Sequence, residues 1–105
     1  MKKIEAVIAP SHLDAVRREL ERRGIRSGLT VVGVQHSHGE KGLRRTAKES
    51  SGPLHDRVKL ELMLEDSEIE KAVDVILRHA QPEFDQQGGQ IAVLEVSEIL
   101  RIGEG

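Results

Sequence analysis

The two halves of this 105-residue chain resemble each other. The segment KIEAVIAPSHLD at 3–14 aligns with KLELMLEDSEIE at 59–70: each has Lys-x-Glu within an alternating apolar run, then a serine, then an aliphatic residue followed by an acid. Each copy predicts a strand, a short turn and a helix. The chain is therefore expected to fold as two similar halves.

Four segments have the period of two that half-buried strands require. In 58–64 a valine and three leucines alternate with Lys59, Glu61 and Met63, and residues 4–9 alternate in the same way. Two further apolar segments, LTVVGVQ at 29–35 and QIAVLEV at 90–96, each follow a predicted helix. Each half of the repeat thus continues into a second strand.

Two segments carry apolar residues at helical spacing. Ser11 is predicted to cap the first helix and Gly24 to end it in a left-handed conformation. Ser67 and Glu70 predict a capping box for the second helix, which Pro82 follows. The apolar stripes are Leu13, Val16 and Leu20 in the first helix, and Ile69, Ala72, Val73, Ile76, Leu77 and Ala80 in the second.

The order βαββαβ predicts an α+β, ferredoxin-like fold, a four-stranded antiparallel sheet with both helices on one face. One domain over 1–105 is expected. A long polar connection at 36–57 joins the two halves, and a loop at 82–90 precedes the last strand. Connections as long as 36–57 are uncommon in compact domains unless they are functional or disordered.

The sheet face away from the helices is predicted to be apolar, with Val7, Ala9, Val31 or Val32, and Met63. A bare apolar face of this kind is normally buried against a partner. Symmetric self-association is the simplest way to bury it.

Composition excludes several other classes of protein. The single aromatic residue, Phe84, leaves no platform for stacking bases, and a net charge of -2 without a basic face argues against nucleic-acid partners. Ser50 and Ser51 have no histidine and acid at informative spacing, which argues against a hydrolase. No apolar run suits a signal peptide or a membrane span, so a soluble, cytoplasmic protein without direct membrane insertion is expected.

Strings along the whole chain carry a resemblance. They are MKKIEAVIAPSHLDAVRREL at the start, GIRSGLTVVGV, EKG at 40–42, RVKLEL at 57–62 and LEVSEILRI. In order and spacing they resemble the PII signal-transduction (nitrogen regulatory protein P-II) family, of which this chain looks like a divergent member. The resemblance implies a non-catalytic regulator and a homotrimer whose sheets face inward. It also implies that 36–57 corresponds to the T-loop, a mobile arm that inserts into a membrane transporter or metabolic enzyme.

In that family, ATP, ADP and 2-oxoglutarate bind in clefts between subunits and set the shape of the T-loop. The resemblance places the cofactor-binding positions at Thr30, Gly39, Glu40, Lys41, Gly88, Gly89 and Arg101.

Several of those positions depart from the family pattern. Gly39 replaces an arginine, Glu40 a glutamine, Gln90 the phosphate-binding lysine and Gly103 one of two C-terminal arginines, while Arg101 is kept. A triphosphate carries about four negative charges and needs several cations around it. The losses favour AMP or ADP, or no nucleotide, over tight ATP binding. The chain has no tyrosine, so uridylylation of a T-loop tyrosine is excluded.

The histidines suggest an alternative function, a metal-responsive binding protein on the same trimeric scaffold. His36 and His38 are two residues apart at a strand end and so share a face, and His55 lies where the connection re-enters the sheet. Imidazoles with a carboxylate such as Glu40 suit zinc, copper, nickel or cobalt. Solvated surface histidines are the other interpretation.

Overall fold

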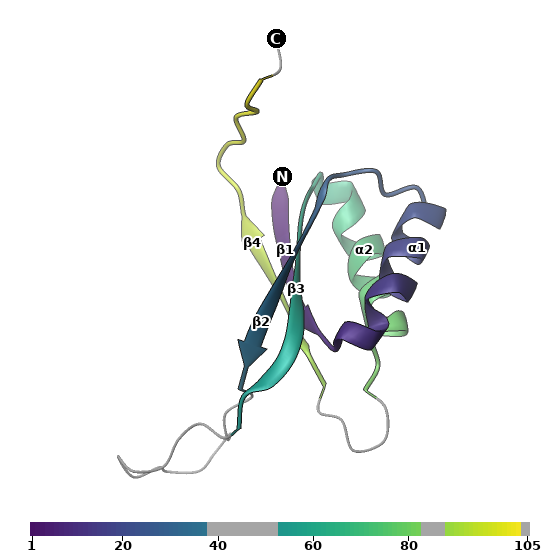
Figure 1. Ribbon diagram of the computed structural model, residues 1–105. Helices are drawn as coiled ribbons and strands as arrows, with labels where there is room; N and C mark the ends of the chain where they lie inside the picture. Colours follow the sequence, from purple (N-terminus) through teal and green to yellow (C-terminus); the bar gives the residue numbers. More distant parts are fainter. Residues whose placement is uncertain (38–52, 83–87, 104–105) are drawn as a thin grey trace.

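The computed structural model describes residues 1–37, 53–82 and 88–103. Its elements follow in the order β1 (Lys2–Ile8), a short 3-10 turn (Pro10–His12), α1 (Leu13–Arg22), β2 (Leu29–His36), β3 (His55–Leu64), α2 (Asp66–His79) and β4 (Gln90–Glu95). The strands form one sheet in the order β2-β3-β1-β4, with antiparallel neighbours. Both helices cover the same face (Figure 1). The predicted ferredoxin-like α+β fold is confirmed.

The core lies between the helices and one face of the sheet. Ile4 pairs with Leu62 and Ala6 with Leu60, so the alternating apolar residues of β1 and β3 share this face, as predicted. The stripe of α2 differs from the prediction, because Val75 is 0% exposed whereas Leu77 is 52% exposed. The cluster of buried core residues is Ile4, Ala6, Ile8, Val16, Leu20, Ile25, Leu60, Leu62, Leu64, Ala72, Val75 and Ile76.

The predicted serine caps are wrong. A 3-10 turn takes up Ser11, so α1 has its N-cap at His12, and α2 has its N-cap at Glu65, which leaves Ser67 inside the first turn. Among the described residues neither N-cap side chain makes a capping hydrogen bond. The end of α1 does follow the prediction, since Gly24 has a φ of 81° just past the helix.

A charged clamp fixes α1 against α2. Arg23, just past α1, donates to Asp74 of α2 at 2.9 Å, and Arg78 donates to the same carboxylate at 2.9 Å. Lys71 reaches the Arg23 carbonyl oxygen at 3.3 Å. The hydrogen bond from Arg23, and then that from Arg78, holds the pKa of Asp74 below its ordinary value.

The sheet narrows to two strands at one end. The β1–β3 pairing ends at Ile8 opposite Val58, but β2 and β3 stay paired to His36 opposite His55. The predicted connection at 36–57 is therefore too long at both ends, since β2 includes residue 36 and β3 includes residues 55–57. Figure 1 shows them projecting beyond the rest of the sheet. We call these three rungs, residues 34–36 and 55–57, the β2–β3 ribbon.

The face away from the helices, the open face, is less apolar than predicted. Val7, Val32 and Met63 lie on it, but Val31 pairs with Leu60 and so faces the helices, and Ala9 follows the end of β1. The remaining open-face positions at its centre are charged: Lys3, Glu5, Lys59 and Glu61. The sequence left open whether Val31 or Val32 lies on this face, and the strand register places Val32 there.

After β4 the chain leaves the body of the domain (Figure 1). The Val96 amide still donates to the Met1 carbonyl oxygen at 3.3 Å, and residues 97–103 then form no helix or strand. Leu100 is 81% and Ile102 99% exposed. In the described ranges neither helix is both long and apolar enough to cross a bilayer.

Candidate functional site

The predicted cofactor-binding residues lie on opposite edges of the sheet. Thr30 is on β2, on the open face beside its register partner Glu61. Gly88 and Gly89 lead into β4, the other edge strand. Three strand spacings, about 14 Å, separate β2 from β4. Residues 39–41, with the predicted Gly39, Glu40 and Lys41, lie outside the described residues.

The same residues are also separated along the strands. Gly89 precedes Gln90, which pairs with Val7 near the end of β1, whereas Arg101 lies beyond Glu95, which pairs with Lys2 at its start. β4 alone spans roughly 17 Å between those points. A single chain therefore does not bring Thr30, Gly89 and Arg101 together. A site that uses all three must draw groups from more than one copy.

Gly89 also has a packing role. A Cβ atom at this position would lie 1.8 Å from the Val7 carbonyl oxygen, much closer than any carbon can approach. The close approach of residue 89 to the backbone of β1 therefore requires glycine at this position, independently of any ligand. A mainly apolar cavity of about 470 Å³ adjoins this turn, bordered by Ile8, Ile76, Ala80 and Pro82 among others.

A network of charges crosses the middle of the open face. The Lys3 ammonium lies 2.9 Å from Glu5 and 3.6 Å from Glu61, and Lys59 lies 3.2 Å from Glu61. The hydrogen bond from Lys3 holds the pKa of Glu5 below its ordinary value, and the bond to Glu5 raises the pKa of Lys3. We call these four residues the open-face network.

Sequence reasoning missed this network, although a signal for it exists. Lys-x-Glu occurs at the same place in both halves of the repeat, as Lys3 with Glu5 and Lys59 with Glu61. In each strand the pair alternates with core residues. Antiparallel pairing of β1 with β3 then sets Glu5 directly opposite Glu61, so the two acids share the lysines around them.

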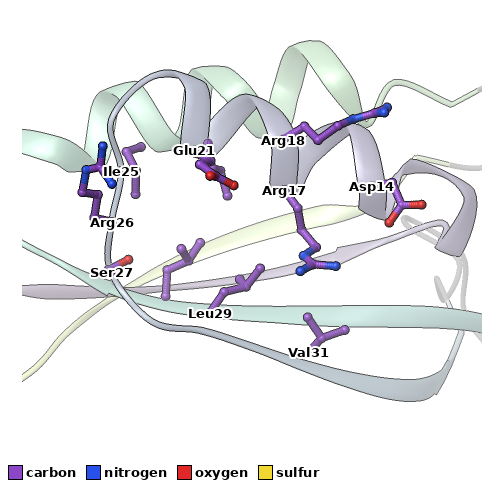
Figure 2. A pocket seen from close by; sticks show the side chains of 11 residues that line it. Asp14, Arg17, Arg18, Glu21, Ile25, Arg26, Ser27, Leu29 and Val31 are labelled. Carbon is purple, nitrogen blue, oxygen red and sulfur yellow. The ribbon is translucent and has the colours of Figure 1, made fainter.

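A second hollow, of about 610 Å³, lies between α1 and the edge strand β2 on the helix side (Figure 2). Its sheet side includes Leu29 and Val31, and Val31 is 41% exposed because α1 does not reach over it. Arg17 extends from α1 toward the sheet, whereas Arg18 points away from it (Figure 2). Other lining residues are Asp14, Glu21 and Arg26, so the groove carries both signs of charge.

The structure brings two of the three predicted metal-ligating histidines together. His36 on β2 and His55 on β3 are register partners in the outermost rung of the β2–β3 ribbon, and both are half-buried. His38 lies outside the described residues, as does Glu40. Within the described residues no cluster of three or more metal-ligating side chains occurs.

The fold and the positions of the predicted cofactor-binding residues define a class of protein: a ferredoxin-like α+β domain whose predicted ligand residues do not meet within one chain. Comparison with known families identifies the class more closely. The profile described as Nitrogen regulatory protein P-II matches residues 1–105, and the chain therefore belongs to that family.

Known relatives agree over nearly the whole chain. It is 38% identical over 108 residues to "Nitrogen regulatory protein P-II 1" of Escherichia coli K12, a match that covers 100% of this chain and 94% of that protein. It is 34% identical over 104 residues to "Nitrogen regulatory protein P-II" of Pyropia yezoensis, covering 97% and 91%. The chain is thus a non-catalytic signal-transduction regulator, of a family that acts in nitrogen regulation.

Proposed function

We propose that this chain forms a homotrimer that senses a small ligand in clefts between subunits. The 36–57 connection then controls a membrane transporter or a metabolic enzyme, and the protein acts in the cytoplasm. The observation that carries the proposal is the separation of Thr30, Gly89 and Arg101 over opposite edges and ends of one sheet. Family membership predicts that these residues serve one ligand, and only neighbouring copies can assemble them.

Exposed apolar groups support the assembly. Val32, Met63 and Leu94, at 42%, 42% and 41% exposure, surround the open-face network. Because its charges are already paired within the chain, burying this face leaves no isolated ion. β2 and β4 are both edge strands with one unpaired side. Contacts between unlike regions of successive copies, such as the 97–103 tail and an edge strand, form a closed ring of three when each copy is rotated by a third of a turn.

The ligand that fits the proposal is AMP or ADP. Thr30, Gly89 and Arg101 remain at the expected positions and Gly88 adjoins Gly89, but Gln90 supplies no charge where the family has a lysine. With fewer cations to offset it, a third phosphate adds repulsion rather than affinity. ATP is expected to bind more weakly than ADP.

Oligomeric state and ligand binding test the proposal together. Light scattering on a size-exclusion column should give three times the chain mass at micromolar concentration, and Met63→Asp combined with Val32→Asp should shift the protein to a monomer. A thermal-shift series with AMP, ADP, ATP, 2-oxoglutarate, bicarbonate and divalent metals should raise the melting temperature with ADP or AMP. A wild-type monomer that binds none of these would contradict the proposal.

The partner interaction needs a separate test. Deleting residues 43–52 should leave the trimer and the ADP-dependent rise in melting temperature intact, because no core residue is removed. The deletion should abolish capture of the partner from a membrane or soluble extract. Loss of the trimer in this variant would show that the connection supports the fold rather than partner binding.

A further inference from the structure

We propose that His36 and His55 form a two-histidine binding site for a divalent transition-metal ion at the end of the β2–β3 ribbon. The observation is their register: the two residues are direct cross-strand partners, and both lie on the open face. Side chains so paired have Cβ atoms about 4.5–5.5 Å apart. That separation lets two imidazoles turn toward one ion at the metal–nitrogen distance of about 2.0–2.1 Å typical of zinc.

The strands hold this pair in place before any metal binds. On the opposite face of the ribbon Gln35 donates a hydrogen bond to Asp56, its own register partner, in the rung next to the histidines. That bond joins β2 to β3 beyond the point where β1 ends. Two ligands already fixed in register lose little conformational freedom on binding, which favours chelation over binding to separate surface histidines.

The side chains around the two histidines determine which metal ions suit the site. Arg57 lies two residues along β3 on the same face, and its guanidinium donates to the Asp56 carbonyl oxygen at 2.7 Å. Asp56 is on the other face, bonded to Gln35. With no carboxylate on the histidine face of this ribbon, hard ions such as Mg²⁺ and Ca²⁺ lack their oxygen ligands. Ions that prefer imidazole, such as Zn²⁺, Ni²⁺ and Cu²⁺, suit it, with water in the remaining positions.

Binding would tie β2 to β3 at the root of the 37–54 connection. Strand pairing already closes the connection at this rung, so a metal bridge would add a second link between the same two residues. Any effect on a partner rests on the proposed function above. The metal site itself does not, since binding is measured on the purified chain alone.

Calorimetric titration of the full-length protein with Zn²⁺ tests the site, and His79→Ala on α2 is the matched control. The wild type and the control should bind one ion per chain at pH 7.5. Loss of an outer-shell partner alone costs about 10–100-fold in metal affinity, so His36→Ala and His55→Ala should each weaken binding at least about tenfold.

Thermal melts in EDTA confirm that the variants are folded, and Zn²⁺ should raise the melting temperature of the wild type and the control only. Three results overturn the site: no Zn²⁺ binding to the wild type at submillimolar concentration, wild-type affinity in His36→Ala or His55→Ala, or loss of binding in His38→Ala alone. A regulator that responds to ADP but not to Zn²⁺ would retain the proposed function and remove this inference.

Discussion

The two faces of the sheet are built from alternate residues of the same strands, yet they differ in polarity and in burial. The helix face of β1 and β3 is aliphatic, and Leu60, Leu62 and Leu64 are at most 2% exposed. The open face of the same strands carries the open-face network with exposed apolar residues around it. The first face holds the core of the subunit, and the second is the face that the proposed assembly would bury. Substitutions one residue apart can separate the two roles.

The largest difference is expected between Leu62→Ala and Met63→Ala. Leu62 is 2% exposed among the core side chains, so its truncation should lower the free energy of unfolding by about 2–5 kcal/mol. Met63, the next residue, is 42% exposed on the open face, and its truncation should change the stability of the isolated subunit by no more than about 0.5 kcal/mol.

Urea denaturation at several protein concentrations makes this measurement. The loss in Leu62→Ala should be the same at every concentration. In Met63→Ala the further loss comes from assembly, so it should be largest at high protein concentration and shrink toward zero as both proteins are diluted and dissociate. Equal and concentration-independent losses in both variants would remove the distinction between the two faces.

The edge strands offer a second comparison, Gly89→Ala against Gly33→Ala. Alanine at 89 meets the Val7 carbonyl oxygen, so β4 must move away from β1 at a cost of about 1–3 kcal/mol. At Gly33 on β2 a Cβ has nothing within 4 Å, and alanine should be neutral or stabilise by up to about 1 kcal/mol.

The two glycine variants also separate packing from ligand binding. Thermal melts without ligand should show the loss in Gly89→Ala. A Gly89→Ala protein with wild-type stability but without ADP binding would assign this glycine to the ligand and not to the packing of β4 on β1.

Sequence patterns predicted the helix face well and the open face poorly, for a physical reason. Burial of Ile4 and Leu60 follows from a period of two that any half-buried strand must keep. The polarity of the other face depends on strand pairing: β1 with β3 sets Glu5 opposite Glu61, and β2 with β3 sets Val31 opposite Leu60. Register is a long-range property, and adjacent valines do not encode it.

The sequence did not predict the start of α2 or the positions of the ligand residues in the sheet, and the reasons are related. Ser67 is a residue type that favours helix caps, but α2 begins earlier, at Asp66, two residues after β3 ends at Leu64. The resemblance named Thr30, Gly89 and Arg101 as ligand residues, but no spacing along one chain shows that they lie on opposite edges and ends of the sheet. The pairing of His36 with His55 was foreseeable in part, since the two residues flank the connection between consecutive strands.

The smallest effect is expected in the open-face network. The hydrogen bond from Lys3 lowers the pKa of Glu5 in the folded chain, so Glu5 contributes stability above the ordinary pKa of a glutamate. That contribution is lost as the pH falls through the lowered value, because protonation removes the charge that Lys3 binds. Glu5→Gln should therefore lose a little stability at pH 7 and show a shallower decline in melting temperature on acidification.

Glu21→Gln is the control for this titration, since Glu21 is exposed on α1 and forms no ion pair with the part of the chain that the structure describes. Melting temperatures measured from neutral to acid pH should decline in this control as in the wild type. Because ion pairs at half-exposed positions are screened by salt, the difference between Glu5→Gln and the wild type should shrink at high ionic strength. Two results would contradict this prediction. The melting-temperature difference between Glu5→Gln and the wild type could grow with salt, or Glu21→Gln could differ from the wild type by the same amount as Glu5→Gln.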